Sequence, residues 1–227
     1  MGRDGWGDEI ASGVVLTIAL ALATLPIGLV LGFFIALAKN TGESSLVLAA
    51  NIYTTLFRGL PELLTLFIVY FGVQIAINQL FEALGFGSIE INSFFAGMIA
   101  LSLVFSSFSS EVFLSAFKGV ASGQYEGASA LGLSRLQTMR LVILPQIIRL
   151  ALPGLSNLWL ILLKDTSLVM VIGLSDTLRQ VSIAARVSRE AFFFFFLACL
   201  IYLVLSIISS IGIGRIEAWT RRGDFGR

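Results

Sequence analysis

Charged residues that lie inside apolar stretches are the first candidates for chemistry in this sequence. Glu111 interrupts one such stretch, and Lys164 and Asp165 stand together in another, where the hydroxyls of Thr166 and Ser167 follow them. Removing a charge from water costs free energy, so each of these side chains needs a partner or a purpose. Neighbouring helical positions point about 100° apart, so Lys164 and Asp165 are expected to face different surroundings.

The residues that most enzyme and metal sites need are missing from the sequence. It has no histidine, its single cysteine is Cys199, and it has no Gly-x-x-x-x-Gly-Lys-Ser/Thr stretch to hold the phosphates of ATP. No nucleophile–base pair or set of metal ligands is visible, and a formal net charge of +1 gives no sign of a nucleic-acid partner. The sequence therefore predicts neither an enzyme nor an ATP-binding subunit.

Five apolar stretches must position these charges. Of the 227 residues 57% are hydrophobic and only 13% are charged. About 20 apolar residues in a helix cross the hydrocarbon core of a bilayer. We expect spanning helices at residues 13–38, 63–80, 93–117, 151–174 and 191–214, which form a single membrane domain over residues 1–227. The first stretch is too long for the core of a signal peptide, so the fold class is an all-α membrane protein with five transmembrane helices.

Lysine and arginine residues outside the spans orient the chain. With the N-terminus outside and the C-terminus in the cytosol, ten of them lie inside and four outside, as the positive-inside rule favours. Three of the four outside residues sit together between the last two spans and are the exceptions to the rule: Arg179, Arg186 and Arg189.

The connection at residues 118–150 is cytosolic in this orientation and has a distinctive pattern. A short helix is expected from Glu126 to Leu131, with Gly132 at the position that follows a helix end. Ser134 and Gln137 have the spacing of a capping box, which predicts a second helix from Arg135 to Leu144. Pro145 disfavours helical geometry at Leu144 and removes a backbone donor, so we expect the chain to kink there.

This segment resembles the signature loop of permease subunits in ATP-binding-cassette importers. The matching residues are Glu126, Gly127, Ala128, Gly132, Val142, Leu144 and Pro145, although the family pattern has alanine at the position of Gly127 and isoleucine at that of Val142. Two further stretches, residues 53–72 and 151–169, are similar to the polar amino acid branch, and the residues "RGLPE" around Glu62 are similar to permeases for histidine, lysine, arginine, ornithine and opines.

The resemblance implies a type I importer fold, a bacterial inner-membrane location and several partners. The helix before Gly132 would insert into a separate ATPase dimer, which would hold the ATP and magnesium, and this chain would carry no cofactor. A second permease subunit, identical or paralogous, and a periplasmic substrate-binding protein would complete the importer. The residues expected to contact the ATPase are Glu126, Gly127, Ala128, Leu131, Gly132, Leu144 and Pro145.

The charges inside the spans, and Glu62 at the entrance of the second span, then become candidates for the substrate path. Glu62 would complement a guanidinium or ammonium group, or would form an ion pair with Arg58 one turn earlier. Glu111 would line the path, or would cap a helix or pair with an arginine. The cluster of Lys164, Asp165, Thr166 and Ser167 would contact the path or the partner permease, or would be a packed polar seam.

Three other readings of the chain stay open at this point. It could be a transporter driven by ion gradients alone, but such folds usually contain inverted repeats, and no convincing repeat is visible. It could be a membrane scaffold that transports nothing, although a polar cluster in the fourth span argues against that. An enzyme with an intramembrane site has the least support.

Overall fold

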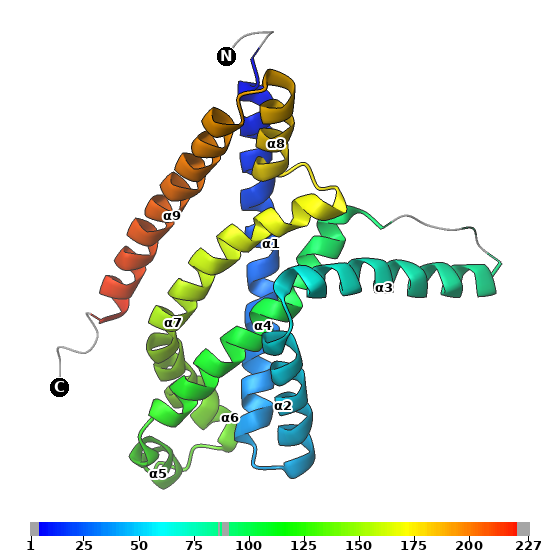
Figure 1. The fold of residues 1–227 in the computed structure, drawn as a ribbon. Coiled ribbons are helices and arrows are strands. Elements are labelled where there is room, and N and C mark those ends of the chain that lie inside the picture. Colours follow the sequence, from blue (N-terminus) through cyan, green and yellow to red (C-terminus); the bar gives the residue numbers. More distant parts are fainter. Residues whose placement is uncertain (1–4, 86, 88–90, 222–227) are drawn as a thin grey trace.

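Long helices dominate the computed structural model of this protein, which describes residues 5–85, 87 and 91–221 (Figure 1). In these residues, five helical stretches are long and apolar enough to cross a membrane, as the sequence predicted. They contain α1 (Gly7–Asn40), α3 (Glu62–Ala83), α4 (Ser93–Gly119), α7 (Leu144–Asp165) and α9 (Ala191–Arg221). Shorter helices connect them: α2 (Ser44–Gly59), α5 (Ser122–Ala130), α6 (Arg135–Gln137) and α8 (Thr177–Ser188), with a π-helical turn η1 (Thr138–Ile143) and a 3₁₀ helix η2 (Thr166–Ile172).

Two features of the connections differ from the expected pattern. Helix α2 fills most of the connection between the first two spans, which the sequence reading left without a helix. The fourth span was expected at residues 151–174, but α7 begins at Leu144 and its α-helical geometry ends at Asp165, where the tighter η2 continues to Ile172. The polar cluster at residues 164–167 thus lies where one helix type changes into another.

A close contact between α1 and α4 forms the centre of the molecule. Gly28 of α1 lies against the ring of Phe105, and Gly32 lies against Ser109 and the backbone of Ser106, so neither position has room for a Cβ atom. The Ser109 hydroxyl donates a hydrogen bond of 3.2 Å to the carbonyl of Gly28. The Gly-x-x-x-Gly spacing in the first span therefore marks a real helix contact, in which small residues let two backbones approach.

Helix α8 and the α5–α6 segment lie at opposite ends of the molecule (Figure 1). Helix α8 packs beside the first turns of α1, where Thr17 and Thr177 share a hydrogen bond of 2.8 Å and Gly13 lies against the backbone of Asp176. Helix α9 descends from this end toward the α5 end. The first helix thus begins, and the last helix ends, toward opposite ends of the molecule.

Helix α3 projects sideways from the rest of the chain (Figure 1). Only Thr65 and Leu66 of this helix are buried. Its exposed apolar side chains include Leu63, Leu64, Ile68, Phe71, Ile75 and Leu80. An exposed apolar surface of this extent requires lipid or another protein to cover it.

Candidate functional site

The turn after α5 has the geometry that the sequence predicts for the connection at residues 118–150. Gly132 has a φ of +74°, a conformation that favours glycine. Its N–H donates to the carbonyl of Ser129 at 3.0 Å, and the N–H of Leu133 donates to the carbonyl of Ala128 at 3.1 Å. These two bonds form a Schellman motif, so the prediction of a helix that ends before Gly132 is confirmed, but α5 begins at Ser122, four residues before the predicted start at Glu126.

The predicted capping box at the next helix is also present. The Ser134 hydroxyl accepts a hydrogen bond of 3.3 Å from the N–H of Gln137, and the Gln137 side chain accepts one of 2.9 Å from the N–H of Ser134. These bonds satisfy two backbone donors that a helix start leaves free. Two consecutive caps, one that ends α5 and one that begins α6, fix the direction of the chain between them.

The expectation that Leu144 departs from helical geometry is wrong. Leu144 has helical dihedral angles of −57° and −43°, and its N–H donates to the carbonyl of Met139, five residues earlier. The wider π-helical turn moves the preceding carbonyls away from the proline ring, which would collide with one of them in a regular α-helix. Pro145 then occupies the first turn of α7, where its missing N–H costs little.

The exposed residues of the connection at residues 118–150 form a small projecting surface. Leu131 is 82% exposed and Leu136 is 78% exposed, and Glu126, Gly127 and Gly132 are exposed as well. Ala128 was also expected to contact the ATPase, but it is only 4% exposed and faces inward. The last two expected contact residues are Leu144, which is partly buried, and Pro145, which is exposed.

A buried and well-packed base supports this surface. Val120, Ile143 and Ile147 belong to one apolar cluster with the end of α4, and Gln146 donates a hydrogen bond of 3.1 Å to the side chain of Gln124 in α5. Movement of α5 would therefore be transmitted to α4 and α7.

Glu111 lies at the centre of a charged cluster that joins three helices. The Lys39 ammonium of α1 donates to Glu111 at 2.5 Å and to the Thr54 hydroxyl of α2 at 2.7 Å. The Arg58 guanidinium approaches the same carboxylate at 3.6 Å and lies 5.6 Å from the centre of the Phe108 ring. Of the alternatives for Glu111, this geometry favours charge pairing.

An ion pair between Arg58 and Glu62 is not formed, so that expectation was wrong. Helix α2 ends at Gly59, and Leu60 and Pro61 have extended backbone conformations before α3 begins. The two residues therefore do not share one helical face. Among the described residues Arg58 pairs with Glu111 instead, which leaves the Glu62 carboxylate available for another cation.

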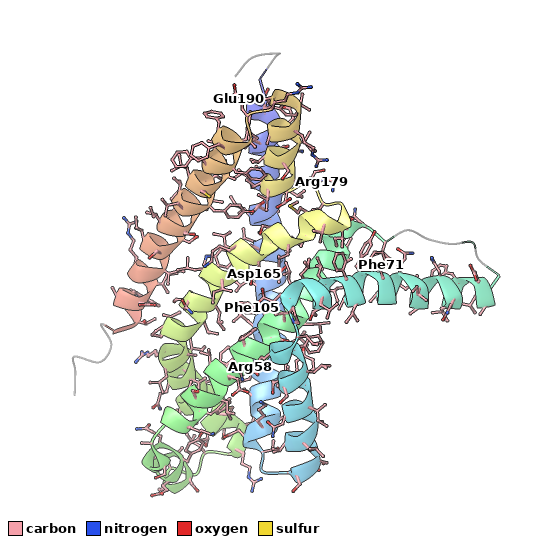
Figure 2. The ribbon with its side chains drawn as sticks, in the orientation of Figure 1. Arg58, Phe71, Phe105, Asp165, Arg179 and Glu190 are labelled. Carbon is pink, nitrogen blue, oxygen red and sulfur yellow. The ribbon has the colours of Figure 1, made fainter. Side chains whose placement is uncertain are left out.

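Glu62 and Asp165 line the same small cavity. The cavity has a volume of about 110 Å³ and lies between α3, α4 and α7. Its other walls are apolar and are made by Leu101, Val104, Phe105, Phe108, Leu158, Ile161 and Leu162. Asp165 and Phe105 lie near the crossing of these helices in Figure 2. Two carboxylates that face one apolar cavity repel each other, and a cation between them removes that repulsion.

The remaining residues of the polar cluster face elsewhere. Lys164 and Ser167 line a different hollow of about 280 Å³ against α9, beside Cys199 and Tyr202. Thr166 is fully buried and donates to the carbonyl of Leu163 at 2.8 Å. The structure thus separates Lys164 from Asp165, as expected for adjacent helical positions, and gives Thr166 a packing role.

Sequence reasoning missed Lys39 and Phe108. Lys39 served only to orient the chain, although its place at the end of an apolar helix was a signal that it pairs with an acid such as the half-buried Glu111. Phe108 gave no signal, because one phenylalanine among 19 in the sequence does not stand out. Its ring separates Arg58 from the cavity that holds Glu62 and Asp165.

A larger hollow lies at the outer part of α3 and contains none of the predicted site residues. Its volume is about 1140 Å³, and it is bounded by α3, the beginning of α4 and the turn at residues 173–175. Aromatic and amide side chains face it, including Tyr70, Phe71, Gln74 and Asn92.

Comparison with known proteins identifies the class to which this fold and site belong. Residues 28–222 match the family described as "Binding-protein-dependent transport system inner membrane component", and the chain belongs to this family. It is an integral inner-membrane permease subunit of an ATP-binding-cassette importer, and it is a transport subunit rather than an enzyme.

Particular relatives cover nearly the whole chain. The nopaline transport system permease protein NocQ of Agrobacterium fabrum is 38% identical over 226 residues, which cover 98% of this chain and 95% of that protein. The histidine/lysine/arginine/ornithine transport system permease protein HisQ of Escherichia coli is 34% identical and covers 91% of this chain and 90% of its own length.

Solved structures agree with the fold. A crystal structure of an amino acid ABC transporter with histidines superposes with a TM-score of 0.77 at 31% identity, over 93% of this chain and 94% of that chain. An inward-facing MetNI methionine ABC transporter also has a TM-score of 0.77, over 97% of this chain and 99% of that chain, but at 15% identity it supports the fold alone.

Membership of this family resolves the alternatives that the sequence left open. A binding-protein-dependent importer works with an ATPase and a substrate-binding protein, so a transporter driven by ion gradients alone, a membrane scaffold and an intramembrane enzyme are no longer supported.

Proposed function

We propose that this chain forms half of the membrane pathway of an importer for basic amino acids or basic opines. The observation that carries this proposal is the cavity that Glu62 and Asp165 share. Its apolar walls exclude water, and its two carboxylates match a guanidinium or ammonium group, to which carboxylates make charge-assisted hydrogen bonds. The names of the relatives, which include permeases for histidine, lysine, arginine, ornithine and opines, support the same substrate class.

A second permease subunit, identical or paralogous, would complete the pathway. The exposed apolar surface of α3 supports this, because a single copy buries only Thr65 and Leu66 of that helix and leaves many of its apolar side chains exposed. Lys164 and Ser167, which line an open hollow, would meet either this partner or the substrate.

The α5 helix would dock in the cytosol on an ATPase that holds ATP and magnesium. Leu131 would enter an apolar part of the ATPase surface, and the rigid turn at Gly132 would transmit its movement. Closure of the ATPase dimer on ATP would shift the permease between inward- and outward-facing packings, because the nucleotide binds the two states with different affinity. This chain would change shape and carry out no covalent chemistry.

Uptake measurements on two variants test the substrate class. In reconstituted vesicles with the cognate binding protein, we expect Glu62→Gln and Asp165→Asn each to reduce arginine uptake at least tenfold, the equivalent of about 1.4 kcal/mol. Glu126 lies far from the cavity, so Glu126→Gln should leave the substrate preference unchanged: the uptake rates of different substrates should keep the ratios that they have in the wild type. Both cavity variants must assemble with the ATPase for the result to count. If they transport basic amino acids like the wild type, the cavity does not bind the cationic group.

A further inference from the structure

Helix α8 carries a group of arginines that the transport pathway does not use. Arg179, Ser182 and Arg186 follow one another at helical spacing and line a hollow of about 370 Å³ with Met170, Ile183 and Val187. The opposite face of α8 is buried, with Val181, Ala184 and Ala185 packed against α1 and α9. The basic face is therefore held in a fixed orientation, and Arg179 is labelled on it in Figure 2.

The described part of the chain balances the positive charges of this face only in part, through the attraction between Arg179 and the Asp176 carboxylate. No carboxylate among the described residues forms an ion pair with Arg179, Arg186 or Arg189. Helix α8 itself contains no acidic residue, and the Asp176 side chain that begins it accepts the backbone N–H groups of Leu178 and Arg179. The face is thus a preformed site for negative charge supplied from outside the chain.

The location of these arginines is unusual for a membrane protein. Helix α8 lies at the end opposite to α5, so with α5 in the cytosol it lies outside, where the positive-inside rule disfavours arginine. Their presence on the disfavoured side calls for a function at that position. A binding-protein-dependent importer has one protein partner that must reach this side, the substrate-binding protein.

We propose that the α8 face formed by Arg179, Ser182 and Arg186 is a docking surface for acidic side chains of the substrate-binding protein. Arginine forms planar paired hydrogen bonds with carboxylates, which gives such a contact direction as well as attraction. The proposal depends on the proposed function only through the orientation of the chain, and it holds for whichever amino acid the importer carries.

The same face connects to the candidate substrate cavity. The Arg179 guanidinium donates a hydrogen bond of 3.0 Å to the carbonyl of Met170 in η2. The η2 segment follows directly after Asp165. An acidic group that draws Arg179 outward would therefore pull on the segment that positions the Asp165 carboxylate, so docking and substrate release are mechanically linked.

Binding measurements test this surface. The probe is the cognate substrate-binding protein, closed around its substrate, and the target is the complete transporter in nanodiscs of neutral phosphatidylcholine. We expect Arg186→Gln to raise the dissociation constant about tenfold and Arg186→Glu to raise it further. In both variants the affinity should depend less on salt than in the wild type. Arg215→Gln, which removes the same charge near the other end of α9, should leave the constant unchanged.

A charge exchange adds a readout that a folding defect would not reproduce. Acidic residues of the binding protein are replaced by lysine one at a time. We expect one of these replacements to restore binding to the Arg186→Glu transporter and to weaken binding to the wild-type transporter. Wild-type affinity in both Arg186 variants would overturn the proposal. Equally, if the variants kept the wild-type affinity for the binding protein but lost phosphatidylglycerol that co-purifies with the wild type from membranes containing it, the face would be a lipid site.

Failure of this test is distinguishable from failure of the proposed substrate class. The binding assay keeps Glu62 and Asp165 intact and measures the affinity for the binding protein, whereas the uptake assay keeps Arg186 intact and measures transport by the cavity variants.

Discussion

Single carboxyl groups have different tasks in this molecule, and their surroundings decide which. Glu111 is paired with a lysine and an arginine and joins α1, α2 and α4. Glu62 and Asp165 face an apolar cavity without a cation from the described part of the chain, which suits them to bind one. The sequence places all three carboxyl groups in or beside apolar stretches. It does not distinguish their tasks, because their partners come from distant segments.

Asp176 has a structural task that makes stability depend on pH. Its carboxyl group is fully buried and accepts the N–H groups that begin α8. Burial raises its pKa to about 6, although these hydrogen bonds and the nearby Arg179 charge lower it. The folded state therefore favours the protonated acid more than the unfolded state does.

The sign of the pH effect follows from this shift. As the pH rises from about 4 to about 6 the folded protein binds more protons than the unfolded chain, so its stability falls, and the loss is complete above that window. Asp176→Asn keeps an oxygen for the same N–H groups and does not ionise. We expect the melting temperature of the wild type in detergent to fall between pH 4 and pH 7 by several degrees more than that of Asp176→Asn. Melting curves with the same pH dependence in both proteins would contradict this assignment.

At the scale of elements, the contact between α1 and α4 limits which residues the first span can accept. Gly32 lies directly against Ser109 and the Ser106 carbonyl. A valine there collides with backbone that cannot move aside without separating the helices. We expect Gly32→Val to lower the melting temperature and the yield of assembled transporter, at a cost of the order of the 1–3 kcal/mol typical of overpacking.

A matched substitution in the last helix provides the control for this prediction. Gly212 of α9 has open space around it, so Gly212→Val should reduce stability much less. Equal losses in the two variants would show that helix propensity, and not the α1–α4 contact, determines the effect.

Element boundaries were predicted well where local chemistry decides them and poorly where it does not. The end of α5 just before Gly132 and the start of α6 just after Ser134 are each determined by residues a few positions apart, and both are confirmed. The π-helical turn before Pro145 and the 3₁₀ helix after Asp165 depend on how α7 packs on α4 and η2 on α3, which the sequence does not display. Helix α2 was missed because it is only partly apolar and too short to span a membrane.

Across the whole molecule, the two proposed docking surfaces lie at opposite ends of one helical body. The α5 surface with Leu131 lies at one end, and the basic face of α8 lies at the other. Between them lies the cavity of Glu62 and Asp165. The number of spanning helices was predictable from apolar length, whereas the shared cavity required the packing of α3 and α7 on α4.

We propose that the α5 end faces the cytosol and binds the ATPase. A single engineered cysteine tests both the orientation and the contact. Leu131 is 82% exposed, so Leu131→Cys in a Cys199→Ser background presents a single reactive thiol. In intact cells we predict that a membrane-impermeant maleimide does not label this thiol, and that in inverted vesicles a short cross-linker joins it to the ATPase subunit. Labelling in intact cells, or a complete absence of the cross-link in an assembled transporter, would contradict the account.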